Sequence, residues 1–180
     1  MTDLLALPPR NEDGAVHVVV ESPAGATVKL KYDPKLRVFM VSRPLVLGLR
    51  YPHDWGFIPG TLAEDGDPLD ALVVGDTPTY PGVVHVTRPI AVLRVTQRKK
   101  HGKPGERERN DRIIAVSVKA FRDDGIHDLS HLPDRVRAEL SLLFEMVVGL
   151  EQKELTIEGW GDRIEAERII EQAIGAHVAG

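Results

Sequence analysis

The sequence has no cysteine, so disulfide bonds and thiolate metal sites are excluded. It also lacks any run near 18 apolar residues, and residues 1–14 contain neither a basic segment nor an apolar segment of signal-peptide length. The formal net charge of -4 provides no electrostatic attraction for nucleic acid or for an anionic membrane. These absences predict a cytoplasmic protein that binds neither a membrane nor nucleic acid.

Length and composition are those of a globular protein with one domain. Its 180 residues compare with a typical domain of roughly 150 residues. Hydrophobic residues make up 42% and charged residues 28%, which is enough of each for a buried core and a solvated surface. We therefore expect residues 1–180 to form a single domain.

The first two-thirds of the chain contain short apolar segments separated by Pro, Gly and Asp clusters. Because β-branched residues dominate these segments, they are predicted to be strands. The predicted strands comprise residues 17–22, 27–32, 37–42, 70–74, 83–88, 90–96 and 112–118. Short strands that follow one another without helices between them indicate a small barrel or sandwich.

The last third of the chain changes to a helical period. After Pro133, apolar side chains recur at intervals of three and four, at Val136, Leu140, Leu143, Phe144, Val147 and Leu150. This pattern predicts an amphipathic helix that ends near Gly149. A second helix is predicted after Gly161, with Asp162 as its N-cap and Glu165 as capping-box partner. Its apolar face is expected to consist of Ile164, Ile169, Ala173 and Ile174.

One long polar stretch, residues 97–111, lies between two predicted strands. It contains two glycines, and its basic residues precede Glu106 and Glu108. Three interpretations stay open: a solvated hairpin loop, a basic patch for nucleic acid, and a lid over a charged site. The absence of interleaved aromatic residues disfavours the nucleic-acid interpretation.

The segment "DGDPLD", residues 65–70, brings three aspartates to the start of an apolar predicted strand. Their mutual repulsion next to a buried segment requires a neutralising partner. Carboxylates without Cys or paired His are the donor set of hard cations such as Mg²⁺, Mn²⁺ or Ca²⁺. An EF-hand is excluded because Asp70 stands where the calcium loop needs Gly. The alternative is an Asx-turn with surface charge at a strand entrance.

Four residues of the N-terminal half are expected to face this aspartate cluster in a small barrel, namely Glu21, Lys29, Arg43 and Tyr51. Cations beside a carboxylate–metal site suit a polyanionic ligand, since the metal bridges phosphate oxygens while Lys and Arg neutralise the remaining charge. The combination predicts a site for a phosphorylated compound.

The segment "YPHDWGFIPGTLAEDGDPLDALVV", residues 51–74, closely resembles the signature region of the soluble family I inorganic pyrophosphatases. The similarity extends from "VVVESPAG" at residues 18–25 to "EGW" at residues 158–160. The resemblance implies a mainly β fold, a five-stranded OB-like β-barrel with flanking C-terminal helices. It also implies hydrolysis of pyrophosphate to two phosphates with Mg²⁺, or Mn²⁺ as a substitute, by a homo-oligomer that is a hexamer in bacterial members.

The resemblance also assigns roles to the acidic residues. Asp65 and Asp70 match metal ligands of the family, and Glu21 matches an acidic residue at the rim of the metal cluster. Asp67 matches the carboxylate that takes a proton from the attacking water, and Tyr51 matches an active-site tyrosine. The implied mechanism needs no covalent enzyme intermediate.

The basic residues follow the family in part. Lys29 and Arg43 match cations that hold the phosphates, and Arg112 stands at the position of a family lysine with the same role. Lys31, by contrast, replaces a family glutamate and reverses its charge. Trp55 replaces a tyrosine, so the phenolic donor is lost.

Further departures fall in the polar stretch and in the first helix. Two family aspartates align with Gln97 and Asn110, and a phosphate-binding Tyr-Lys pair aligns with Val147 and Val148. The carboxylates that would substitute for the missing aspartates are Glu106, Glu108 or Asp111. Because of these departures, two alternatives remain beside a Mg²⁺-dependent pyrophosphatase: a binding or regulatory protein that has lost turnover, and a hydrolase of another phosphoanhydride.

Overall fold

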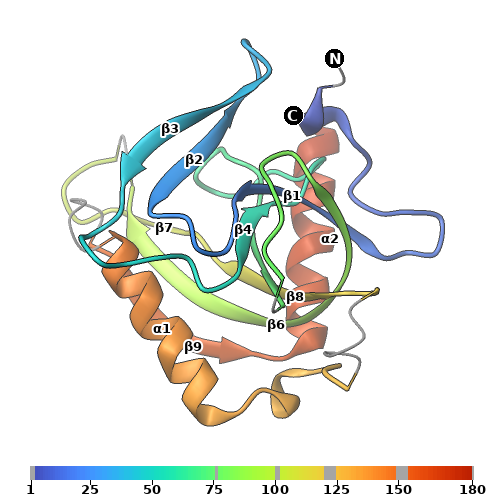
Figure 1. Cartoon of the computed structure of the whole chain (residues 1–180). Coiled ribbons are helices and arrows are strands. Elements are labelled where there is room, and N and C mark those ends of the chain that lie inside the picture. The colour runs from blue at the N-terminus through green and yellow to red at the C-terminus, as the bar shows by residue number, and fades with distance from the viewer. Residues whose placement is uncertain (1–2, 76, 100–101, 120–124, 149–153, 180) are drawn as a thin grey trace.

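The computed structural model describes residues 3–75, 77–99, 102–119, 125–148 and 154–179 (Figure 1). Its elements are, in chain order, η1 (Leu4–Ala6), β1 (Val16–Ser22), β2 (Val28–Asp33), β3 (Val38–Pro44), β4 (Asp54–Phe57), β5 (Asp70–Val74), β6 (Val84–Arg98), β7 (Arg107–Arg109), β8 (Arg112–Ser117), η2 (Leu129–His131), α1 (Asp134–Val148), β9 (Thr156–Gly161) and α2 (Arg163–Ala179).

Five strands form a closed ring. They pair in the order β1, β4, β5, β8 and β6, and β6 pairs again with β1. Only the β5–β8 pair is parallel within this ring. Strands β2 and β3 form a separate two-stranded ribbon that extends beyond the ring (Figure 1). The ribbon therefore stands beside the ring as a separate layer.

The long strand β6 corrects one prediction. Residues 83–88 and 90–96 were expected to form two strands, but they belong to one strand of 15 residues. Pro89 lies at an irregularity in its pairing with β8, between Pro89 and Ala91. Proline has no amide hydrogen to donate to a neighbouring strand, so Pro89 was expected to separate two strands. The length of β6 allows it to pair with β1, β8, β9 and β7 in turn.

Three strands were not predicted: β4, β7 and β9. Strand β4 has only four residues, including one glycine, which is too short a segment to give a strand signal, and all four are buried. Strand β7 is charged at all three positions and is stabilised by pairing with β6. The formation of β4 and β7 therefore depends on contacts with other strands, which the local sequence does not reveal.

The two helices pack against different parts of the sheet (Figure 1). Helix α1 buries Leu140, Leu143, Phe144 and Val147 in a core that includes Tyr51 and Trp55. Helix α2 buries Ala166, Ile169, Ile170 and Ala173 in a core that includes residues of β1, β5, β6 and β8. The end of the first helix was predicted near Gly149, and Leu150 was predicted to lie on its apolar face. Both residues lie outside the described part of the chain.

The start of α2 confirms one prediction and corrects two. Asp162 is the N-cap, because its Oδ1 accepts the Glu165 amide hydrogen at 2.9 Å. The carboxylate of Glu165 does not complete a capping box but contacts Arg94 at 3.4 Å. Ile164 is 74% exposed and is not part of the apolar face. In the described part of the chain, no helix combines the length and apolarity needed to cross a membrane.

Candidate active site

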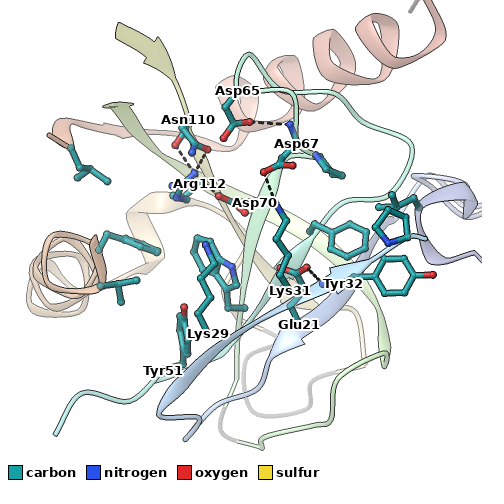
Figure 2. Close-up of a pocket in the computed structure, with 18 residues that line it drawn as sticks. Glu21, Lys29, Lys31, Tyr32, Tyr51, Asp65, Asp67, Asp70, Asn110 and Arg112 are labelled. Atoms are coloured by element: carbon teal, nitrogen blue, oxygen red, sulfur yellow. Dashed lines mark hydrogen bonds and ion pairs between the residues drawn. The ribbon is translucent and has the colours of Figure 1, made fainter. Parts of the chain in front are cut away.

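A pocket of about 140 Å³ lies between the β2–β3 ribbon, the loop before β5, and α1 (Figure 2). Of the eight site residues proposed from the sequence, seven line it: Glu21, Lys29, Tyr51, Asp65, Asp67, Asp70 and Arg112. The eighth, Arg43, pairs with Lys29 across the β2–β3 ribbon. The fold therefore brings together residues that lie up to 91 positions apart in the sequence, from Glu21 to Arg112.

A tight turn presents the three aspartates. Gly66 has a φ of +85°, a left-handed conformation that strains other residues. Its amide hydrogen bonds to the Ala63 carbonyl at 3.1 Å, and the Asp67 amide donates to Asp65 Oδ1 at 3.2 Å. The Asx-turn considered as an alternative is thus present. It orients the aspartates toward the pocket, so turn and pocket are parts of one arrangement.

Asp67 forms an ion pair with Lys31. The Lys31 Nζ lies 2.7 Å from Asp67 Oδ2, and Figure 2 shows the lysine reaching from β2 to the aspartate. The two side chains are 51% and 56% exposed. Lys31, which stands where the family has a glutamate, therefore neutralises the carboxylate of Asp67, the residue expected to act as base.

Asp70 forms a second and more buried ion pair. The Arg112 Nη1 lies 2.6 Å from Asp70 Oδ2, and the two residues are neighbours at the start of the parallel strands β5 and β8. The same nitrogen donates to the Asn110 carbonyl at 2.7 Å and to its side-chain Oδ1. The guanidinium carbon lies 5.4 Å from the Trp55 ring centre. Arg112 thus neutralises the negative charge of Asp70.

Burial is the main influence on the pKa values of the remaining carboxylates of the pocket, Asp65 and Glu21. Burial raises the pKa of Asp65, and the charges of Asp70 and Asp67 raise it further. Burial also raises the pKa of Glu21 to about 7, against the lowering effect of the Tyr32 amide, which donates to Glu21 Oε1 at 2.7 Å. Within the described ranges, no ion pair of Asp65 is found. A cation near Asp65 and Glu21 would therefore be stabilised.

Tyr51 and Trp55 form the aromatic wall of the pocket. Their rings are stacked with centres 6.1 Å apart, and both residues are almost fully buried. Burial raises the pKa of Tyr51 above its ordinary value, so the hydroxyl remains a hydrogen-bond donor. Trp55 Nε1 is buried and makes no hydrogen bond to any described residue. The indole of Trp55 thus offers a donor at the position where the family tyrosine would offer its phenol.

The polar stretch 97–111 forms a hairpin between β6 and β7 as far as it is described. The prediction of a hairpin is confirmed, but the hairpin is not solvated throughout, because several of its polar residues are buried. Glu108 is buried and accepts a hydrogen bond from Gln97 Nε2 at 3.1 Å. Asp111 accepts from the Val95 amide at 3.0 Å and lines another pocket beside α2. Asn110 lines the candidate site, whereas the described carboxylates of the hairpin do not.

The α1 side of the pocket is apolar. Phe144 and Val147 line it, at the helix where the family's Tyr-Lys pair was aligned. The side chain of Val148 lies outside the described part of the chain. No phosphate-binding group therefore comes from Val147.

The donor chemistry of the pocket fits a hard divalent cation, because Asp65, Asp70 and Glu21 offer oxygen ligands only. Over the described residues, however, no three Asp, Glu, His or Cys side chains converge closely enough to hold an ion as they stand. Lys31 and Arg112 each pair with one carboxylate oxygen of the cluster. A divalent cation at the cluster would meet these two positive charges.

Comparison with protein families decides the affiliation of the chain. Residues 18–177 match the family model described as inorganic pyrophosphatase. The chain belongs to the inorganic pyrophosphatase family. The matched region contains every residue that lines the pocket except Leu5.

Individual pyrophosphatases agree with this affiliation. The inorganic pyrophosphatase of Nostoc sp. is 33% identical over 175 residues, covering 97% of this chain and 99% of the relative. That of Sulfolobus acidocaldarius is 38% identical over 171 residues, covering 93% and 94%. The crystal structure of inorganic pyrophosphatase from Thermus thermophilus superposes with a TM-score of 0.89 at 35% identity and covers 98% of this chain and 99% of that one. The expected family and fold class are confirmed.

Proposed function

We propose that this chain hydrolyses inorganic pyrophosphate to two phosphates in a Mg²⁺-dependent reaction with Asp67 as general base. The observation that carries the proposal is the convergence of Asp65, Asp67 and Asp70 with Lys29 and Arg112 on one pocket of a pyrophosphatase-family chain. Carboxylates alone would repel a polyanion, and cations alone would not need three aspartates. Their combination suits a phosphoanhydride bound together with a divalent cation.

The β2–β3 ribbon and the aromatic wall supply groups for the phosphates. Lys29 lines the pocket, and Arg43 lies opposite it across the ribbon. Tyr51 keeps its hydroxyl proton and therefore serves as a donor to a phosphate oxygen. These donors would hold the two phosphoryl groups in place and stabilise charge that develops on the leaving phosphate. Arg112 contributes to the positive potential through its position beside Asp70.

Asp67 is suited to accept a proton because its side chain is 56% exposed and borders the pocket. A water between Asp67 and the substrate would donate its proton to the carboxylate as it attacks phosphorus. Asp65, Asp70 and Glu21 would hold Mg²⁺, with Mn²⁺ as a substitute. The bound cation supplies Lewis-acid charge to the phosphoanhydride.

The test is phosphate release from pyrophosphate across a Mg²⁺ titration, with ATP as a second substrate. We expect release from pyrophosphate that rises with Mg²⁺ and is supported by Mn²⁺. Release from ATP alone would replace this proposal by hydrolysis of another phosphoanhydride. Absence of release from both at every Mg²⁺ and Mn²⁺ concentration would overturn it in favour of a binding protein without turnover.

We further infer that the chain acts as a single domain and as a cytoplasmic homo-oligomer, a hexamer by family resemblance, without membrane or nucleic-acid partners. Exposed apolar side chains on and after the β2–β3 ribbon support an oligomer, among them Val41 at 65% and Leu47 at 101% exposure. Light scattering of the purified protein tests this part. A mass equal to that of one chain would contradict it.

A further inference from the structure

The ion pairs of Asp67 and Asp70 differ in burial. The Arg112 side chain is 6% exposed and its partner Asp70 21%, whereas Lys31 and Asp67 are both more than half exposed. An exposed ion pair contributes about 0–1 kcal/mol, so another ion can displace it at little cost. A buried pair is held by the penalty of leaving either charge alone. Lys31 is therefore the exchangeable cation of the cluster, and Arg112 the fixed one.

The ammonium of Lys31 lies where several negative charges meet. Besides Asp67, the charges of Glu21 and Asp70 act on it. Lys31 also stands on the same face of β2 as Lys29, two residues away, and both side chains line the pocket (Figure 2). A divalent cation bound to the aspartates would meet this positive charge at close range. A phosphate in the pocket would instead attract it.

We propose that Lys31 is a built-in counter-ion of the aspartate cluster, which competes with divalent cations at Asp67 and moves to the substrate's phosphate when the pocket fills. Without substrate, the pair lowers the affinity of the cluster for metal. With substrate, the ammonium leaves Asp67, which then accepts a proton. The first statement concerns the protein alone, and the second rests on the proposed function.

The first experiment measures Mn²⁺ binding to the metal-free protein by calorimetry, without substrate. We expect Lys31→Gln to bind Mn²⁺ about tenfold more tightly than the unmodified chain, because a positive charge near the divalent ion is removed. Lys31→Arg keeps the charge and should retain the unmodified affinity. Lys35→Gln, at an exposed position in the turn after β2, is the matched control and should change nothing. Unchanged or weaker Mn²⁺ binding by Lys31→Gln overturns the competition.

The second experiment measures binding of imidodiphosphate, a non-hydrolysable analogue, to the Mn²⁺-saturated protein. We expect Lys31→Gln to weaken this binding about tenfold, and Lys31→Arg to preserve it. Equal affinities for the three proteins would overturn the transfer of Lys31 to phosphate. Because neither measurement uses turnover, an inactive chain would refute the proposed function and leave the Mn²⁺ result to decide the competition separately.

Discussion

Two acidic stretches of this chain meet different partners. In the loop of residues 65–70, Asp67 and Asp70 pair with Lys31 and Arg112, which come from other strands and face the pocket. In the 97–111 hairpin, Glu108 bonds to the residue opposite it on the neighbouring strand, Gln97. The hairpin carboxylate is satisfied by its local geometry, whereas the loop carboxylates depend on the assembled fold. Of the described carboxylates in these two stretches, only those of the loop line the pocket.

Local structure explains this difference. Strands β6 and β7 place Gln97 and Glu108 directly opposite each other, and such cross-strand pairs interact as soon as the hairpin forms. Asp65 and Asp67 precede β5 and belong to no strand, so the Asp67 side chain remains available to the ribbon. Asp70 begins β5, and Arg112 lies opposite it only once the distant strand β8 has paired. Carboxylates thus stabilise a hairpin in one place and line a pocket in the other.

The largest effect on stability is expected for Arg112→Met. It removes the partner of a mostly buried carboxylate, and we expect the free energy of unfolding to fall by about 3–5 kcal/mol. Urea denaturation measures the loss. The control is Arg135→Met, since Arg135 pairs with Glu139 at 2.8 Å but is 89% exposed. That variant should lose no more than about 0.5 kcal/mol. Equal losses would show that burial does not distinguish the two pairs.

A smaller effect on the free energy of unfolding is expected from the titration of Glu21 with pH. Its folded-state pKa of about 7 lies above the ordinary 4.5, so between these values the native state binds more protons than the unfolded state. The resulting stabilisation is complete below pH 4.5 and is lost as the pH rises toward 7. Metal-free protein should lose about 2–3 kcal/mol over this interval. Glu21→Gln should remove most of that slope, and an unchanged slope in the variant would contradict the assignment.

The smallest effect on stability is expected for glycine-to-alanine changes, one in the loop and one in the hairpin, and these two variants should differ in activity. Gly66 in the loop and Gly105 in the hairpin have φ values of +85° and +87°, and an added Cβ meets no atom within 4 Å at either position. Each Gly→Ala change should therefore cost about 1 kcal/mol in the free energy of unfolding. Only Gly66→Ala should also lower kcat, since it disturbs the turn that orients Asp65 and Asp67. A similar loss of kcat in Gly105→Ala would assign a catalytic role to the hairpin.

The sequence predicted which residues line the candidate pocket better than it predicted their contacts. Asp65, Asp67 and Asp70 stood out because three charges precede an apolar strand. Glu21 was expected to face them in a small barrel, and it lines the same pocket. The partners of these carboxylates were not predictable, because pairs such as Lys31 with Asp67 form only when the ribbon packs beside the loop.

The fold was predictable where the hydrophobic period was regular, as in β1, β5, β8 and the two helices. It was not predictable in β4, which is buried on all sides, or at Pro89, where a proline interrupts the pattern but not the strand. In both cases tertiary packing overrides local propensity.

The most direct measurement compares the rate of phosphate release from pyrophosphate by Asp67→Asn and Glu108→Gln at saturating Mg²⁺. Both variants replace one carboxylate by an amide, one in the loop and one in the hairpin. We predict that Asp67→Asn loses at least about 100-fold in kcat, as expected for removal of a general base, while Glu108→Gln remains within about threefold of the unmodified chain. Equal losses, or a larger loss in Glu108→Gln, would contradict the assignment of catalysis to the loop.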